Sequence, residues 1–309
     1  MHYQPDDALV AILHALERSA YRFITVTPAT HKSMLRRYEA EEARTLRDVF
    51  GWSLPFRAPT ISTELLDLLR RADAVEEVGA LMKSRLRVAS IGSRLFLHSA
   101  FPTEDDHSVF FGPDTYRFAA FIAAELPRLG PVRRIVDIGA GSGAGGIIAA
   151  GLAPGARVTF TDVNPEALHL AGANASHAGV EPEMVHGEDL NEVTGPVDLI
   201  LANPPYMMDE SDRAYRNGGG MHGAAVSLDW ALSGARRLEP GGHMLLYTGV
   251  AIVDGRDALR EALERQLPTL QCVFDYREID PDIFGEELEK PSYLGVERIA
   301  AIGAVIVRR

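Results

Sequence analysis

The segment Asn203-Pro-Pro-Tyr206 combines residues that can act together on a planar nitrogen. An amide or ring-amine nitrogen is a poor nucleophile because its lone pair is delocalised into the neighbouring π system. The side-chain oxygen of Asn203 can accept one of its N–H bonds, and the backbone carbonyl oxygen of Pro204 can accept the other. Two acceptors outside the plane of the nitrogen favour a pyramidal geometry, and they bind more strongly as positive charge develops there. The segment therefore predicts group transfer to an amide or amino nitrogen.

The rest of the segment holds the acceptors and the substrate in place. Pro204 and Pro205 restrict φ to roughly −65° and so fix the carbonyl group. Tyr206 offers a flat ring on which a planar amide or base can stack. The apolar run 197–202, which precedes Asn203, is typical of a buried strand. Ligands in open α/β sheets bind at the carboxyl ends of strands, which disfavours the alternative of a Pro-rich loop that only turns the chain.

A glycine-rich segment, residues 136–146, reads Val-Asp-Ile-Gly-Ala-Gly-Ser-Gly-Ala-Gly-Gly and lies between a predicted strand and a predicted helix. Its glycines let the backbone turn sharply and approach a ligand closely. The spacing Gly141-x-Gly143-x-x-Gly146 also satisfies the fingerprint of dinucleotide-binding loops. Asp137, however, places a negative charge at the end of the strand. That charge suits the sulfonium and amino acid part of S-adenosylmethionine and suits a pyrophosphate poorly.

Two further acids follow predicted strands. Asp162 closes the second strand, 23 residues after Gly139, where a carboxylate can accept hydrogen bonds from both ribose hydroxyls of either cofactor. The alternative is a helix N-cap, because Asp162 and Asn164 precede Pro165 and proline is favoured in the first helical turn. Asp189 lies just past the third strand, where it can accept from an adenine amino group. A solvated loop acid is the alternative there.

The elements that must position these residues alternate between strand and helix from Arg133 onward. This alternation predicts an α/β fold with a mostly parallel, Rossmann-like sheet and helices on both faces. The predicted strands are residues 134–138, 157–161, 184–186, 197–202 and 242–247, and helices begin near Ala144 and Pro165. Residues 271–277 and 299–307 add two strands with no long helix between them, which predicts an antiparallel pair at the sheet edge.

The N-terminal part of the chain is predicted to be mostly helical. Apolar residues recur at helical spacing from Leu9 to Tyr21, which predicts a first helix. A second helix is predicted over residues 30–49, and a third begins near Ser62 and ends near Ser84.

A β-hairpin is predicted to close this N-terminal part. The alternating runs 86–91 and 94–98 are joined by the turn residues Gly92-Ser93, a pattern typical of two paired strands. Helices followed by a hairpin resemble a winged-helix module, and a small helical cap over the catalytic domain is an equal alternative. We predict a substrate-docking domain over residues 1–105 and a catalytic domain over residues 106–309.

The chain has 309 residues and a formal net charge of −12, and the imbalance lies in its second part. Residues 1–105 contain 14 basic and 14 acidic residues, whereas residues 106–309 contain 17 and 29. An acidic catalytic part repels a free polyanion and offers no counterion release for nucleic-acid binding. Nucleic acid is therefore disfavoured as a substrate. The residues that could form a compensating basic face are Arg36, Arg37, Arg44 and Arg47.

Other composition features point to a cytoplasmic protein without membrane or metal partners. The single cysteine, Cys272, excludes an internal disulfide and disfavours a metal–thiolate cluster. The histidines show no metal-ligand spacing, so no metal is predicted. The N-terminus lacks the basic and apolar regions of a signal peptide. The longest apolar stretches, such as residues 299–307, are far shorter than the ~20 residues of a membrane-spanning helix.

Together these motifs resemble the class I S-adenosylmethionine-dependent methyltransferases that carry an (Asn/Asp/Ser)-Pro-Pro-(Tyr/Phe/Trp) motif. Within that set the chain looks most like the release-factor glutamine methyltransferase group and its relatives, the small-domain methyltransferases. The resemblance spans residues 108–309 and is carried by residues 137–143, Asp162 and residues 203–206. Residues 109–115 also resemble the segment that precedes the core in that group. The chain departs where it reads Gly-Pro-Asp-Thr-Tyr for the usual Arg-Pro-Asp-Thr-Glu, and where a hairpin ends the N-terminal domain.

The resemblance implies an N-methyltransferase with S-adenosylmethionine as cofactor and a protein glutamine as acceptor. Asn203 to Tyr206 would grip the target nitrogen, with Asn203 also beside the cofactor. The other implied cofactor-binding residues are Asp137, Gly139, Ala140, Gly141, Ser142, Gly143, Asp162, Asp189, Phe111 and Thr115.

Several functional alternatives stay open from the sequence. The acceptor can instead be an adenine or cytosine amino group in RNA or DNA, or a small metabolite. From different classes come an NAD-dependent oxidoreductase, favoured only by the glycine spacing, and a non-catalytic binding module. The glycine-rich segment 215–223 is either a lid over the substrate or a flexible connector.

Overall fold

The computed structural model describes the chain apart from residues 1–5, 39–41, 104, 188–189 and 209–215. Backbone contacts divide the chain into two compact units. The first contains residues 1–116, 141–144 and 164–184, and the second contains residues 117–140, 145–163 and 185–309. The domain boundary after residue 105 stays a prediction. None of the helices in the described ranges has the length and apolar character needed to cross a bilayer.

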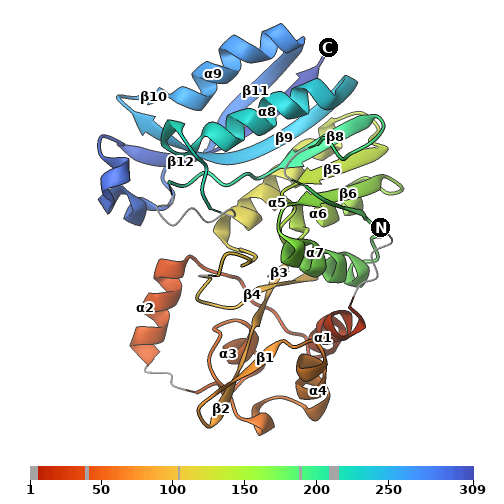
Figure 1. The fold of residues 1–309 in the computed structure, drawn as a ribbon, viewed down its shortest axis with the longest axis vertical. Helices are drawn as coiled ribbons and strands as arrows, with labels where there is room; N and C mark the ends of the chain where they lie inside the picture. Colours follow the sequence, from red (N-terminus) through yellow and green to blue (C-terminus); the bar gives the residue numbers. More distant parts are fainter. Residues whose placement is uncertain (1–5, 39–41, 104, 188–189, 209–215) are drawn as a thin grey trace. The chain divides into compact units, whose positions relative to one another are not determined.

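The first unit combines helices with two β-hairpins (Figure 1). Its helices are α1 (Asp7–Arg18), α2 (Pro28–Tyr38), α3 (Leu46–Phe50), α4 (Thr63–Arg71) and α7 (Pro165–His177), with a 3₁₀ turn η1 (Ala58–Thr60). Its strands are β1 (Val75–Val78), β2 (Leu81–Ser84), β3 (Leu86–Ile91) and β4 (Arg94–Ser99). β1 pairs with β2 and β3 pairs with β4, both antiparallel. The hairpin predicted from the sequence is β3–β4 and is confirmed.

Apolar helix faces form the core of the first unit. α1 starts at Asp6, whose side chain accepts hydrogen bonds from two backbone N–H groups of the first turn. The helix buries Ile12, Leu13 and Leu16, as the apolar spacing predicts. The same core includes Leu170 of α7. Each fully buried Leu or Ile contributes about 1.5–3 kcal/mol, so this core positions α1 firmly against α7.

Two helix predictions in this unit are wrong. The helix predicted over residues 30–49 is two helices, α2 and α3, because α3 starts afresh at a capping box formed by Thr45. Residues 75–84, predicted as the end of a helix, form the β1–β2 hairpin instead. α4 ends before Asp73, which has a left-handed φ of 48°, and Gly79, with a φ of 62°, makes the tight turn between the strands.

The remaining elements belong mostly to the second unit. Its helices are α5 (Pro113–Glu125), α6 (Ala144–Leu152), α8 (Ala225–Arg237) and α9 (Ala258–Gln266). Its strands are β5 (Arg134–Ile138), β6 (Arg157–Asp162), β7 (Glu183–His186), β8 (Val197–Ala202), β9 (Leu238–Val253), β10 (Arg256–Asp257), β11 (Cys272–Asp280) and β12 (Arg298–Arg308). Its 3₁₀ turns are η2 (Leu126–Arg128), η3 (Met221–Gly223), η4 (Leu267–Leu270), η5 (Gly285–Glu289) and η6 (Pro291–Tyr293).

The strands form one sheet in the order β11-β12-β9-β8-β5-β6-β7, with β10 paired to β9. β5 is parallel to β6 and β8, and β8 is parallel to β9. β12 is antiparallel to both β9 and β11. This arrangement confirms the predicted α/β fold and the antiparallel strands at one edge. Helices α8 and α9 pack against β9 (Figure 1). The apolar core of this unit buries Val136, Ile200 and Met244 completely.

Candidate active site

Three of the predicted site residues lie side by side at one edge of the sheet. β5 ends opposite the last residue of β8 and opposite the second-last residue of β6. Gly139 and Asn203 directly follow β5 and β8, and Asp162 ends β6. The strands are parallel, so all three residues lie at their carboxyl ends, where α/β sheets bind ligands. The structure thus brings the start of the Asn203–Tyr206 segment beside the start of the glycine-rich loop.

Tyr206 is held against the sheet and is only 8% exposed. Its ring lies on Gly249 of β9, where an added Cβ would overlap the ring carbons. The ring of Phe284 packs beside it, with the two centroids 6.3 Å apart. Gly249 therefore sets the position of Tyr206 and of the backbone that follows Asn203. Gly249 and Phe284 could not be found from the sequence, because neither lies near the motif in the chain. Stacking of a substrate on Tyr206 stays a prediction.

The backbone after the motif is tied down by hydrogen bonds. Met207 N–H donates to the carbonyl oxygen of Arg216 at 3.0 Å. Met208 N–H donates to the hydroxyl of Tyr293, a buried residue, at 2.8 Å. The described part of the glycine-rich segment, residues 216–223, is therefore joined to the end of the motif. The first residue of that segment lies outside the described residues.

Replacing Gly249 with Ala is expected to lower kcat by on the order of 10-fold, because the new methyl group pushes the Tyr206 ring and shifts the adjacent acceptors. Steady-state methyl transfer and circular dichroism would be measured together, so that a folding defect is recognised. Gly130→Ala is the matched control, since an added Cβ there meets nothing within 4 Å. Equal kcat values for the two variants would contradict the positioning role of Gly249.

The loop between β5 and α6 uses left-handed backbone conformations. φ is 60° at Gly139, 54° at Gly141 and 75° at Gly143, a region that residues with a Cβ rarely adopt. A Cβ at Gly139 would also come within 2.5 Å of the Trp230 ring on α8. Ala140 N–H donates to a carbonyl oxygen of β6 at 3.0 Å. The glycines are therefore required by the shape of the loop, as the sequence predicts.

Asp137 is a buried carboxyl group beneath this loop, 2% exposed. Its Oδ2 accepts a hydrogen bond from Gly146 N–H, in the first turn of α6, at 2.7 Å. Burial raises the pKa of Asp137 to about 8; the Gly146 hydrogen bond opposes this shift and the nearby Asp162 adds to it. Among the described residues Asp137 has no cationic partner. A buried acid of this kind is poised to pair with a cationic ligand.

The start of α7 separates two roles that the sequence left open for Asp162. Asn164 is the N-cap, and its Oδ1 accepts from Glu166 N–H at 3.0 Å. Asp162 is therefore not the capping residue, and its binding to the ribose stays a prediction. Ser142 is buried, and its carbonyl oxygen accepts from Asn174 Nδ2 at 2.9 Å. The predicted adenine contact, Asp189, lies outside the described residues.

The segment that leads into α5 is packed within the first unit. Phe111 is 2% exposed, and its ring stacks on His98 with centroids 5.1 Å apart. Thr115 is half-buried in the first turn of α5. The hydroxyl of Tyr116, which stands where the resembling group usually has Glu, accepts from Thr25 N–H at 2.9 Å. Tyr116 thus anchors the segment that contains Thr25. Contact of Phe111 and Thr115 with the cofactor stays a prediction.

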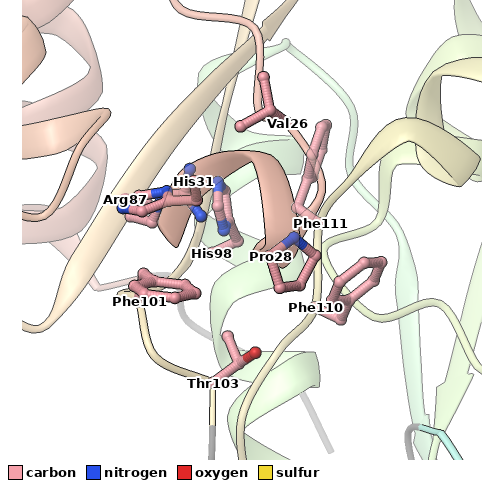
Figure 2. Close-up of a pocket in the computed structure, with 9 residues that line it drawn as sticks. All are labelled: Val26, Pro28, His31, Arg87, His98, Phe101, Thr103, Phe110 and Phe111. Carbon is pink, nitrogen blue, oxygen red and sulfur yellow. The ribbon is translucent and has the colours of Figure 1, made fainter. Parts of the chain in front are cut away.

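Figure 2 shows a small polar pocket of the first unit beside Phe111. Arg87 Nη2, His31 Nδ1 and His98 Nδ1 are buried without a hydrogen-bond partner. Arg87 is 4% exposed, and its Nε donates to a backbone carbonyl oxygen at 2.9 Å. The ring of His31 stacks on Phe101 with centroids 4.1 Å apart. Each unpaired buried nitrogen costs about 1–3 kcal/mol, which bound water in such a pocket offsets.

Both imidazoles in this pocket are held neutral. Burial, together with the charge of Arg87, lowers the pKa of His31 to about 4 and lowers the pKa of His98 well below its usual value. In the unfolded chain His31 takes up a proton near pH 6.5. The contribution of the neutral His31 ring to the free energy of unfolding is therefore complete above pH 6.5, and it is lost as the pH falls toward 4.

The His31→Gln variant is expected to show a flatter pH dependence of stability than the wild-type chain. In the wild-type chain, His31 accounts for on the order of 1–2 kcal/mol of the free energy of unfolding that is lost between pH 7.5 and pH 5. Urea unfolding at several pH values would measure it, and glutamine keeps a donor for the Trp52 carbonyl oxygen that His31 Nε2 contacts at 3.0 Å. A wild-type minus variant difference that is constant with pH would contradict the neutral state of His31.

Comparison with known families identifies the class of the chain. The model of the methyltransferase small domain family matches residues 106–264, just over half of the chain. The chain belongs to this family. As the sequence predicts, the family consists of S-adenosylmethionine-dependent methyltransferases. The left-handed glycines and the buried carboxyl of Asp137, which has no cationic partner in the described part of the chain, fit that cofactor, because they offer close backbone approach and a counter-charge for its cationic end.

Curated relatives of the chain include enzymes named for protein and RNA substrates. A release factor glutamine methyltransferase of Deinococcus radiodurans is 32% identical over 189 residues, 60% of this chain and 66% of the relative. A ribosomal protein uL3 glutamine methyltransferase of Neisseria gonorrhoeae is 32% identical over 149 residues, 44% of this chain and 48% of the relative. A ribosomal RNA small subunit methyltransferase C of Serratia proteamaculans is 32% identical over 73 residues, 24% of this chain and 21% of the relative. In each case the chain covers less than two thirds of the relative's own length.

Proposed function

We propose that this protein transfers the methyl group of S-adenosylmethionine to the amide nitrogen of a glutamine side chain in a protein. The observation that carries the proposal is the shared carboxyl edge, where Asn203 follows β8 beside Gly139 at the end of β5. A protein glutamine as the methyl acceptor is supported by the two relatives named as glutamine methyltransferases, one for a release factor and one for a ribosomal protein.

The chemistry assigned to the motif is the reshaping of a flat amide. When bound, S-adenosylmethionine supplies an electrophilic methyl group on a sulfonium. The Asn203 side-chain oxygen and the Pro204 carbonyl oxygen accept the two amide N–H bonds and favour a pyramidal nitrogen. The nitrogen can lose its proton after methylation, so no general base is needed beforehand. Alignment of the nitrogen toward the methyl group provides most of the rate gain, and Gly249 supports it by fixing Tyr206.

The cofactor-binding roles are assigned to residues at the carboxyl ends of the parallel strands. Asp137 provides the negative charge for the cationic amino acid end. The backbone of residues 139–143 approaches the cofactor closely, and Asp162 accepts from the ribose hydroxyls. Asp189 is assigned to the adenine amino group.

The second candidate acceptor is a nucleobase amino group in RNA. The relative named for ribosomal RNA supports it, and a nucleobase amino nitrogen meets the same two acceptors. The acidic balance of residues 106–309 opposes it, because that part of the chain repels a polyanion. The side chains of Arg36, Arg37, Arg44 and Arg47 are exposed, but exposure alone does not gather them into one face. The protein acceptor is therefore the better supported of the two.

A labelled-methyl transfer assay on fractionated cell extract tests the proposal. The full chain would be incubated with methyl-tritiated S-adenosylmethionine and with separate protein, RNA and small-molecule fractions. We expect protease-sensitive, ribonuclease-resistant label, and methylglutamine in the peptide digest by mass spectrometry. The Asn203→Ala variant is the control for contaminating enzymes. Label found only in RNA would move the assignment to the nucleobase, and NAD binding without S-adenosylmethionine binding would remove methyl transfer altogether.

We also propose that the protein acts in the cytoplasm. Cys272 is a free, buried thiol, which is compatible with a reducing compartment. Fluorescent tagging of the full chain in its host cell would test this assignment.

A further inference from the structure

We propose that His14, Glu17 and His177 form a binding site for a divalent transition-metal ion, best suited to Zn²⁺. The three donor atoms, one from each residue, lie within 4.8 Å of one another. Two imidazole nitrogens and one carboxylate oxygen are a typical ligand set for Zn²⁺. All three residues belong to the first unit, and none of them is assigned a role in methyl transfer.

Two packed helices of the first unit bring the three residues together. His14 and Glu17 are three positions apart on α1, so their side chains lie on the same face of that helix. His177 is the last residue of α7, which packs along α1. The shared core of α1 and α7 fixes the backbone on both sides of the cluster. The site is therefore preformed by helices rather than by a loop.

The distances between the donor atoms suit a tetrahedral ion. His177 Nε2 lies 3.4 Å from Glu17 Oε2, and His14 Nδ1 lies 3.7 Å from the same oxygen. Bonds of about 2.0–2.1 Å in a tetrahedral zinc site place ligand atoms about 3.3–3.5 Å apart. The imidazole rings of His14 and His177 are tilted by 57° to each other, with centroids 4.7 Å apart. Small side-chain rotations would bring all three atoms into one coordination sphere.

His177 gives an independent reason to expect a ligand here. Its side chain is only 6% exposed, and its Nε2 is buried without a hydrogen-bond partner. A metal ion would satisfy the buried nitrogen that Glu17 leaves unsatisfied.

The other two residues leave the site accessible from solvent. The side chains of His14 and Glu17 are 51% and 52% exposed. Among the described ion pairs, Glu17 contacts only the two imidazoles, and the neighbouring Arg18 is paired with Glu64 at 2.7 Å. No described cation thus competes for the carboxylate, and the fourth coordination position remains for water. The bound ion would clamp α1 onto α7.

Metal titration of the full chain tests this site without reference to methyl transfer. Protein stripped with a chelator would be titrated with ZnCl₂ by calorimetry, and with Co²⁺ by visible absorption, which reports tetrahedral geometry. We expect one ion per chain and a higher melting temperature with Zn²⁺. His14→Ala and Glu17→Gln should each weaken binding by at least ~10-fold, since even loss of a group outside the coordination sphere costs that much. Both residues are exposed, so neither change should prevent folding.

His169→Gln is the matched control, because His169 lies on α7 outside the cluster and contacts Asp6 at 3.9 Å. It should bind Zn²⁺ like the wild-type chain. The proposal is overturned if the wild-type chain does not bind Zn²⁺ at micromolar concentrations. It is equally overturned if His14→Ala and Glu17→Gln bind like the wild type, or if His169→Gln weakens binding as much as they do.

Discussion

Asn203→Ala is expected to reduce kcat by on the order of 100-fold or more while leaving the affinity for S-adenosylmethionine nearly unchanged. The substitution removes one of the two oxygen acceptors that hold the amide out of its planar form. Asn203 follows the last residue of β8 at the edge beside Gly139, so its backbone position is set by the sheet and survives the change. Single-turnover methyl transfer and calorimetric titration with the cofactor would separate the two effects.

Asn203→Asp provides the informative comparison. The carboxylate keeps an acceptor oxygen in nearly the same place, so this variant should retain more activity than the alanine variant. Circular dichroism would verify that both are folded. An alanine variant that turns over at the wild-type rate would remove Asn203 from the mechanism, and a selective loss of cofactor affinity would reassign it to cofactor binding.

The affinity for S-adenosylmethionine is expected to fall on the order of 10-fold or more between pH 8 and pH 6. Burial holds the pKa of Asp137 near 8 in the free protein, so the carboxyl is mostly protonated at pH 6 and must lose that proton to pair with a cation. Each pH unit below the pKa costs up to tenfold in binding. The cofactor itself gains positive charge over this interval, so it cannot cause the decline. Calorimetry at pH 6, 7 and 8 would measure the effect.

Asp137→Asn is the matched variant for this prediction. The amide can keep the hydrogen bond from Gly146 N–H through its oxygen, which preserves the contact seen at 2.7 Å. The variant should bind the cofactor more weakly than the wild type at pH 8 and should show little further decline at pH 6. A wild-type affinity that does not change with pH would mean that Asp137 does not carry the counter-charge.

The predictions from sequence were most accurate in the second unit, where the signal is local. β5 and β8 have the bounds that the apolar runs predict, because strands buried on both faces are continuous in apolar residues. The helices and strands of the first unit were predicted less accurately. β1 carries Glu76 and Glu77 between two valines and is largely exposed, so it has no alternating pattern. Pairing with β2 outweighs its weak local preference.

The amino-acid sequence by itself determined the strand–loop–helix units that carry the Asn-Pro-Pro-Tyr segment, the glycine-rich loop and two acids, and it predicted the chemistry assigned to them. These features are readable because they depend on residue type and on spacing within one strand–loop–helix unit. Only the tertiary structure placed Gly249 under Tyr206 and Tyr293 against Met208, and only it joined His14 to His177 across two helices. Such contacts join segments that are far apart in the chain. They depend on how the elements pack in the folded protein, and this packing produces no recognisable pattern in a single sequence.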